Sequence, residues 1–179
     1  ELGVFWGMIN EPPPEGATRA TGRSTYPPFG VLIPTHTMTQ PLRFIHLESN
    51  PADAELISAT LRNAGILCQS KHTQSREEFL AALRQEGFSL ILADTAVPGF
   101  DGAAALALTR TLHPDMPFLF VSGAQGEEFA IDMMQRGATD YISKQRLGRL
   151  APSIKRTLRE LDERLERRRA EDALRVSEK

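Results

Sequence analysis

Short apolar runs alternate with amphipathic stretches between residues 42 and 148. The runs occupy residues 44–47, 66–68, 90–93, 118–121 and 141–142, and most of them are continuously apolar. Such runs are typical of parallel strands buried on both faces. Between the runs, apolar residues recur three or four positions apart, which predicts helices. The pattern therefore predicts an α/β domain with a doubly wound, five-stranded parallel sheet.

Start and stop signals frame the predicted helices. Helix-capping residues stand before the amphipathic stretches, and glycines stand where two of them stop. The predicted starts are Asn50 with Pro51, the capping box at 75–78 and Asp101, and the predicted stops are Gly65 and Gly137.

A longer helix is predicted to begin between Leu147 and Arg149 and to continue to the last residue. Its apolar positions are spaced four, four, three and four apart, which is typical of a coiled-coil seam. These seam positions are Leu150, Ile154, Leu158, Leu161 and Leu165. Residues 149–179 are therefore interpreted as a coiled-coil linker helix that forms a homodimer.

The first 41 residues show neither the helical nor the strand pattern of apolar positions. They hold seven of the 12 prolines and five of the 13 glycines. This composition predicts a flexible leader at 1–41, followed by the α/β domain at 42–148.

Composition excludes several classes of function. The 21 basic and 23 acidic residues give a formal net charge of −2, which provides no global field for binding nucleic acid or an anionic membrane. The single cysteine, Cys68, excludes an internal disulfide framework, and no apolar run approaches the ~20 residues that span a bilayer. We expect a cytoplasmic protein with no nucleic-acid or membrane partner bound by this chain.

Polar residues follow four of the predicted strands. Glu48, Asp94, Ser122 and Lys144 would lie at the carboxyl ends of neighbouring strands if the strand order is 2-1-3-4-5. Two carboxylates, a hydroxyl and an ammonium suit a hard cation beside a carboxylate that attacks a phosphoryl group.

Four motifs in residues 42–150 resemble the receiver domains of two-component response regulators. They occupy residues 47–55, 92–102, 121–123 and 137–144. The resemblance implies the flavodoxin-like receiver fold with an extended C-terminal helix. It also implies that Asp94 accepts a phosphoryl group from a histidine kinase or a phosphotransfer protein.

The same resemblance assigns the other roles. Mg²⁺ would be held by Glu48, Asp94 and the backbone carbonyl of Ala96. Ser122 and Lys144 would bind phosphoryl oxygens, and Ser122 with Tyr141 would form the switch that responds to phosphorylation.

The chain departs from the receiver pattern at two positions. Receivers usually carry two adjacent acids after the first strand, and here the second position is Ser49. Lys144 is followed by Gln145 rather than the usual proline. The segment after Lys144 and the tail resemble receivers joined to sensor kinases and PAS domains, which implies a hybrid histidine kinase or a receiver-PAS protein.

Two rival functions remain open from the sequence. In a pseudo-receiver, the serine at position 49 would abolish metal binding. The domain would then act as a phosphorylation-independent dimerisation or docking module. A phosphohydrolase with an aspartyl-phosphate needs an acid two residues after the nucleophile, where this chain has Ala96. The chain is therefore not expected to be an enzyme, although the longer protein would be a kinase in the hybrid case.

Overall fold

The computed structural model describes residues 41–123 and 126–177, so the predicted leader, apart from Pro41, lies outside the described residues. The elements in chain order are β1 (Leu42–Leu47), α1 (Pro51–Asn63), β2 (Cys68–Thr73), α2 (Arg76–Leu83), β3 (Leu90–Ala93), β4 (Ala96–Val97), β5 (Phe100–Asp101), α3 (Gly102–Leu112), β6 (Phe118–Ser122), α4 (Glu127–Gln135), β7 (Asp140–Ser143), the 3₁₀ helix η1 (Lys144–Arg149) and α5 (Leu150–Ser177).

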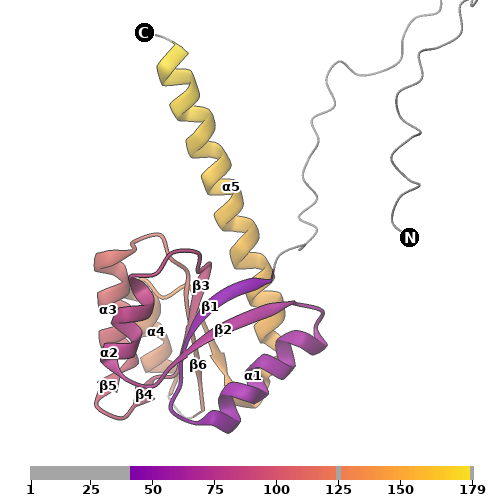
Figure 1. Cartoon of the computed structure of the whole chain (residues 1–179), viewed down its shortest axis with the longest axis vertical. Helices are drawn as coiled ribbons and strands as arrows, with labels where there is room; N and C mark the ends of the chain where they lie inside the picture. The colour runs from indigo at the N-terminus through magenta and orange to yellow at the C-terminus, as the bar shows by residue number, and fades with distance from the viewer. Residues whose placement is uncertain (1–40, 124–125, 178–179) are drawn as a thin grey trace, which may run out of the picture. The chain divides into compact units, whose positions relative to one another are not determined.

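The central sheet has five parallel strands in the order β2-β1-β3-β6-β7. This confirms the predicted 2-1-3-4-5 order, because β4 and β5 form a separate two-stranded antiparallel hairpin. Helices α1 and α5 cover one face of the sheet, and α2, α3 and α4 cover the other (Figure 1). The fold is therefore the predicted three-layer, doubly wound α/β arrangement.

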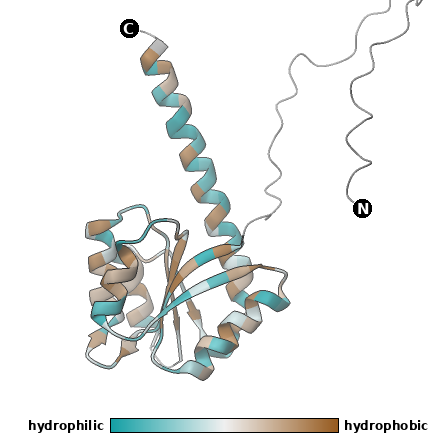
Figure 2. Ribbon diagram, viewed as in Figure 1, coloured by the Kyte–Doolittle hydropathy of each residue, from teal (hydrophilic) through white to brown (hydrophobic). Residues whose placement is uncertain are grey.

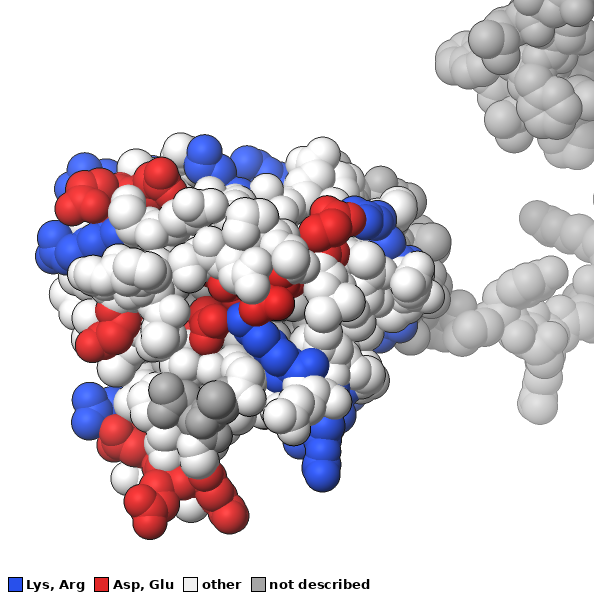
Figure 3. All heavy atoms as spheres, turned by 90° about the horizontal axis from the view of Figure 1, so that it is seen from below, with Lys and Arg blue, Asp and Glu red and all other residues white. Residues whose placement is uncertain are grey.

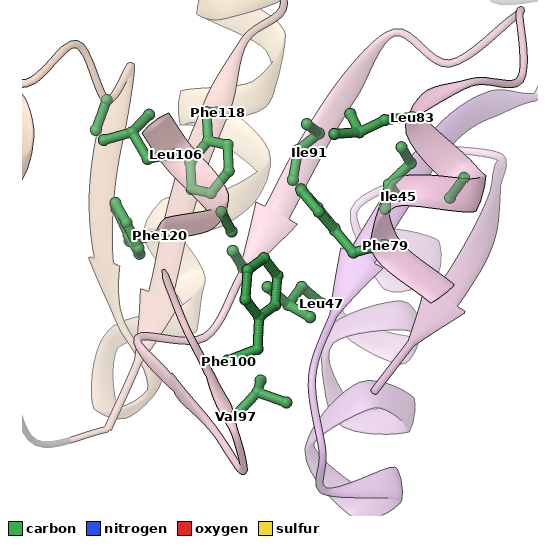
Figure 4. Packing of buried hydrophobic residues seen from close by; sticks show 14 of the residues in the cluster. Ile45, Leu47, Phe79, Leu83, Ile91, Val97, Phe100, Leu106, Phe118 and Phe120 are labelled. Carbon is green, nitrogen blue, oxygen red and sulfur yellow. The ribbon is translucent and has the colours of Figure 1, made fainter. Parts of the chain in front are cut away.

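Both faces of the sheet are buried, which explains the continuous apolar runs. In β1, Phe44 belongs to the cluster under α1 and α5, whereas its neighbour Ile45 belongs to the cluster under α2 and α3. Figure 4 shows the second cluster, in which Phe79 of α2 and Phe118 of β6 meet the side chains of the central strands. Alternate residues of a strand point to opposite faces, so most positions of the central strands are apolar.

The second strand corrects the sequence interpretation. The apolar run at 66–68 predicted a strand there, but β2 begins at Cys68 and continues through polar residues to Thr73. Ile66 is buried before the strand begins, whereas Leu67 is exposed. An edge strand needs backbone pairing on one side only and can expose a face, so its apolar residues do not mark its extent.

The predicted helix starts are confirmed. The side chains of Asn50, Ser75 and Asp101 each accept a hydrogen bond from a backbone N–H in the first turn of α1, α2 and α3 respectively. Gly65 and Gly137 follow α1 and α4 with positive φ, the conformation that lets a chain leave a helix.

The long helix α5 corrects the first part of the coiled-coil seam. Leu150 and Ile154 are fully buried in the domain's own core, and Leu158 packs against that core. Leu150 and Ile154 cannot also pair with a second helix, so the first two turns of α5 pack on the α/β domain rather than on a partner helix. Beyond them α5 is mainly hydrophilic, with hydrophobic residues at intervals (Figure 2). None of the helices in the described part of the chain is long and apolar enough to cross a membrane.

Candidate functional site

The structure brings together the four polar residues that follow the strands. Glu48 comes directly after β1, Asp94 after β3 and Lys144 after β7, and Ser122 is the last residue of β6. Parallel strands end at the same edge of a sheet, so all four residues lie at its carboxyl edge. The side chains of all four are mainly buried.

Lys144 is the centre of the site. Its Nζ atom lies 2.6 Å from Oε2 of Glu48, 2.7 Å from Oδ2 of Asp94 and 2.7 Å from Oδ2 of Asp53. Burial alone would lower the pKa of Lys144, but the hydrogen bonds to the three carboxylates raise it above its ordinary value. Figure 3, which views the domain from this edge, shows acidic and basic side chains in contact near the centre of the face.

Glu48 is fixed in the interior of the site. Its side chain is 1% exposed, with Oε2 on Lys144 and Oε1 accepting a hydrogen bond from the backbone N–H of Asn50 at 2.8 Å. Nε2 of His72, on the neighbouring strand, lies 2.6 Å from the carbonyl oxygen of Glu48. Both the side chain and the backbone of Glu48 are therefore held in place before any ligand arrives.

Asp94 is held ionised by its neighbours. Burial raises the pKa of its carboxyl group, but the hydrogen bond and charge of Lys144, with hydrogen bonds from Ser122 and from the Thr95 N–H, hold that pKa below its usual value. Oδ1 accepts the Thr95 N–H at 2.6 Å, and Oδ2 accepts from Lys144. An ionised carboxylate at the carboxyl edge of a sheet can act as a nucleophile.

Ser122 and Thr95 form a hydroxyl pair beside Asp94. Their Oγ and Oγ1 atoms lie 2.6 Å apart, and both residues are buried. The hydroxyl of Thr95 also lies 3.3 Å from Oδ1 of Asp94. Either hydroxyl can rotate, so the pair can donate a hydrogen bond to a group that is attached to Asp94.

Gly102 lets α3 approach the backbone of Asp94 closely. A Cβ atom at position 102 would lie 2.7 Å from the carbonyl oxygen of Asp94 and 2.6 Å from Cε1 of Phe120. No side chain fits there without moving the backbone that carries the site.

The oxygen atoms of the site are of the kind that hard divalent cations bind. Among the described residues, no group of His, Cys, Asp and Glu side chains is already arranged around a vacant metal position. The carboxylates converge on the ammonium of Lys144 instead, so a divalent cation would have to share them with it. The donor set fits Mg²⁺ in its chemistry.

A family-wide sequence comparison matches residues 45–155 to the response regulator receiver domain. The chain belongs to this receiver family. The match runs from the second half of β1 into the first turns of α5, which agrees with the burial of Leu150 and Ile154 in the receiver core.

Curated relatives agree with this assignment. The chain is 35% identical to the response regulator protein FleR of Pseudomonas aeruginosa over 98 residues, which are 55% of this chain and 20% of FleR. It is 30% identical to the DNA-binding transcriptional regulator NtrC of Salmonella typhimurium over 89 residues, 50% of this chain and 19% of NtrC. The chain therefore spans about a fifth of the length of these relatives.

Solved structures share the fold. The CheY-like receiver domain protein of Methanospirillum hungatei is 25% identical with a TM-score of 0.61, over 70% of this chain and 99% of that one. The receiver domain of NtrX from Brucella abortus is 25% identical with a TM-score of 0.59, over 65% of this chain and 98% of that one. The flavodoxin-like receiver fold with a long C-terminal helix is thus confirmed.

Two residues of the receiver site were missed by sequence reasoning. Asp53 contacts Lys144 from the first turn of α1, and Thr95 bonds both Asp94 and Ser122. An acid in the first turn of a helix is ordinarily explained by the helix dipole, so its type and position gave no signal of a second role. Thr95 directly follows Asp94, and a scan for strand-end hydroxyls would have found it.

The remaining predicted residues lie in β7 and in the β4–β5 hairpin. Tyr141, in β7, is partly buried, and its ring lies 6.4 Å from that of Phe120 and 6.5 Å from that of Phe129. Ala96 is exposed in the β4–β5 hairpin, two residues after Asp94. Lys144 reaches the site although Gln145 follows it, and the side chain of Ser143 caps η1 by accepting the N–H of Gln145.

Proposed function

We propose that this receiver accepts a phosphoryl group on Asp94 from a histidine kinase or a phosphotransfer protein, in a reaction that depends on Mg²⁺. The observation that supports this most strongly is the ionised Asp94 carboxylate beside a buried ammonium and a buried hydroxyl. These are a nucleophile and two groups that stabilise phosphoryl oxygens.

The chemical step follows from these positions. A carboxylate oxygen of Asp94 attacks the phosphorus, a P–O bond forms, and the P–N bond to the donor imidazole breaks, with the nitrogen retaining the electron pair. Lys144 and Ser122 then bind the oxygens of the new acyl phosphate, which carries about one more negative charge than the carboxylate.

Bound Mg²⁺ would supply charge neutralisation between Asp94 and the incoming phosphoryl group. Glu48 and Asp94 are the side chains that we propose for it, with the backbone carbonyl of Ala96. Because Lys144 already occupies the carboxylate oxygens of both acids, it must move toward the phosphoryl oxygens as the cation enters.

We propose that α5 carries the change onward. Lys144 begins η1, which continues directly into α5. The carboxylate of Asp140, at the other end of β7, accepts hydrogen bonds from Ser153 and Arg156 of α5. Strand β7, which carries Tyr141, is thus connected to α5 at both ends, so a displacement of Lys144, Ser122 and Tyr141 would be transmitted to the helix.

We also propose that α5 pairs with a second copy beyond the receiver core. The predicted seam retains Leu161 and Leu165, of which Leu165 is 40% exposed. The proteins FleR and NtrC are regulators by name, and NtrC is named as DNA-binding. A hybrid kinase or receiver-PAS context is a separate proposal that rests on the resemblance of the tail.

Phosphorylation is tested by incubating the whole chain with acetyl phosphate and Mg²⁺ and measuring its intact mass. We expect a gain of one phosphoryl group, lost in Asp94→Asn and in the presence of EDTA. The matched control is Asp132→Asn, an exposed acid of α4, which should behave as wild type. An unchanged mass of the wild-type chain would favour the pseudo-receiver.

Helix pairing is tested by disulfide crosslinking at Leu165→Cys in a Cys68→Ser background. We expect a crosslinked dimer whose yield changes after treatment with acetyl phosphate. Arg167→Cys, about 200° around the helix, is the control and should crosslink poorly. Equal yields at the two positions would contradict a dimer seam through Leu165.

A further inference from the structure

We infer that Asp53 provides the acid that the receiver pattern expects at position 49, so that this receiver holds its divalent cation with a carboxylate from α1. The inference rests on the proposed phosphorylation at Asp94 and names a residue to which the receiver resemblance assigned no role. It explains how a receiver with Ser49 can retain a cation site.

The position of Asp53 is the first support. Its Oδ2 atom, Oε2 of Glu48 and Oδ2 of Asp94 all lie within 2.7 Å of one nitrogen atom. Any two of these oxygens therefore lie within twice that distance of each other. The ammonium acts as an internal stand-in for a cation, and it shows that the three oxygens can surround one centre. Each oxygen would need to move inward by roughly 0.6 Å to reach an Mg–O distance of about 2.1 Å.

Charge is the second support. Three carboxylates surround one ammonium, so the cluster has an excess of two negative charges when all three are ionised. A divalent cation neutralises this excess. Without Asp53, the two remaining carboxylates and Lys144 would leave a single negative charge, which would attract a divalent cation more weakly.

The rigidity of the turn between β1 and α1 is the third support. Glu48 accepts the N–H of Asn50, and Asn50 in turn caps α1 by accepting the N–H of Ala52. Pro51 stiffens the first turn. Asp53 is therefore held at a fixed place relative to Glu48. It is 33% exposed, at the open side of the site, whereas Glu48 is 1% exposed at its base.

The test measures Mg²⁺ affinity by titration with NMR chemical shifts, in wild type, Asp53→Asn, Ser49→Asp and the Ser49→Asp/Asp53→Asn double variant. Glu55→Gln is the matched control, because Glu55 is an exposed acid of the same helix that pairs with Arg62. Circular dichroism establishes that each variant is folded.

We expect Asp53→Asn to weaken Mg²⁺ binding about 10- to 100-fold, the range for removing a group that holds a metal or its bound water. Glu55→Gln should bind as wild type, and the double variant should recover most of the affinity. Ser49→Asp alone should bind more tightly, which provides a readout that does not depend on the folding of Asp53→Asn.

The outcomes separate the two proposals. A wild-type chain that neither binds Mg²⁺ nor gains a phosphoryl group overturns the proposed function. A wild-type chain that does both, with an affinity unchanged in Asp53→Asn, overturns only the role of Asp53. Weakened binding that Ser49→Asp does not restore overturns the claim that Asp53 takes the place of an acid at 49. If Asp53 served only the dipole of α1, its loss would alter stability equally with and without Mg²⁺.

Discussion

Replacing Lys144 by methionine tests the electrostatic account of the site. The substitution keeps a long, flexible side chain but removes the ammonium that Glu48, Asp53 and Asp94 share. The three carboxylates then face one another without the cation that holds them together. We expect the variant to fold less stably than wild type in the absence of divalent cations.

The magnitude follows from the contacts. At separations of 2.6–2.7 Å and an effective dielectric constant of 20, each ion pair contributes about 6 kcal/mol of attraction, and the cost of burying the ammonium offsets much of the total. Breaking a buried pair costs about 3–5 kcal/mol, and the 16% exposure of Lys144 places this case near the lower value. A loss of about 3 kcal/mol lowers the Tm of a domain of this size by roughly 10 °C.

The assay is urea unfolding in EDTA at pH 7, repeated with Mg²⁺. Lys155→Met, an exposed lysine of α5, is the control and should change stability by less than about 0.5 kcal/mol. Mg²⁺ at tenfold its Kd should return about 1.4 kcal/mol to Lys144→Met. Its Kd for the variant should be below that for wild type, because the ammonium no longer competes for the carboxylates.

The difference in the free energy of unfolding between Lys144→Met and wild type should shrink as the pH falls toward 4. In wild type the pKa of Asp94 is lowered, so its contribution to stability is present above about pH 4 and is lost as the pH falls through the folded-state pKa. In the variant, Lys144 no longer lowers that pKa, and burial is opposed only by the hydrogen bonds from Ser122 and Thr95, so the folded state takes up a proton at a higher pH than in wild type and loses less stability on acidification. The reasoning would be refuted if Lys144→Met lost less than about 1 kcal/mol of unfolding free energy in EDTA, or if Mg²⁺ stabilised the variant less than wild type.

Three further substitutions test the packing of the domain and the N-terminal cap of α1. Gly102→Ala should cost about 1–3 kcal/mol in urea unfolding, because its Cβ would meet the carbonyl of Asp94, whereas Gly148→Ala, with open space, should be close to neutral. Ile154→Ala should cost about 2–5 kcal/mol, independently of protein concentration, and equal stability to wild type would contradict its burial in the core. Asn50→Ala should cost about 1 kcal/mol by removing the cap of α1, with no loss expected if the helix begins elsewhere.

The strand-end residues could be predicted because topology alone determines where they lie. Once the order 2-1-3-4-5 is assumed, Glu48, Asp94, Ser122 and Lys144 must share the carboxyl edge, and the structure places them there. Asp53 could not be predicted in the same way. Its contact with Lys144 depends on the entry angle of α1, and the sequence does not encode this angle in a periodic pattern.

The error in the seam of α5 has a different physical cause. Spacings of three and four residues place Leu150, Ile154 and Leu165 on one helical stripe, whether that stripe packs on a partner helix or on the domain's own sheet. Only the three-dimensional structure separates the two, with Ile154 at 0% exposure and Leu165 at 40%.

The burial of the first turns of α5 favours a switch in which the helix moves as a rigid unit. Transmission between two sites needs an element with two discrete arrangements. The hydroxyl pair of Ser122 and Thr95 provides a candidate, because the hydrogen bond between them must break if Ser122 turns to a phosphoryl group on Asp94. Lys144 likewise has two alternative sets of partners, the carboxylates and the phosphoryl oxygens. Ser122 ends β6 and Lys144 follows β7. Both side chains would therefore change partners beside β7, the strand to which α5 is bound through Asp140.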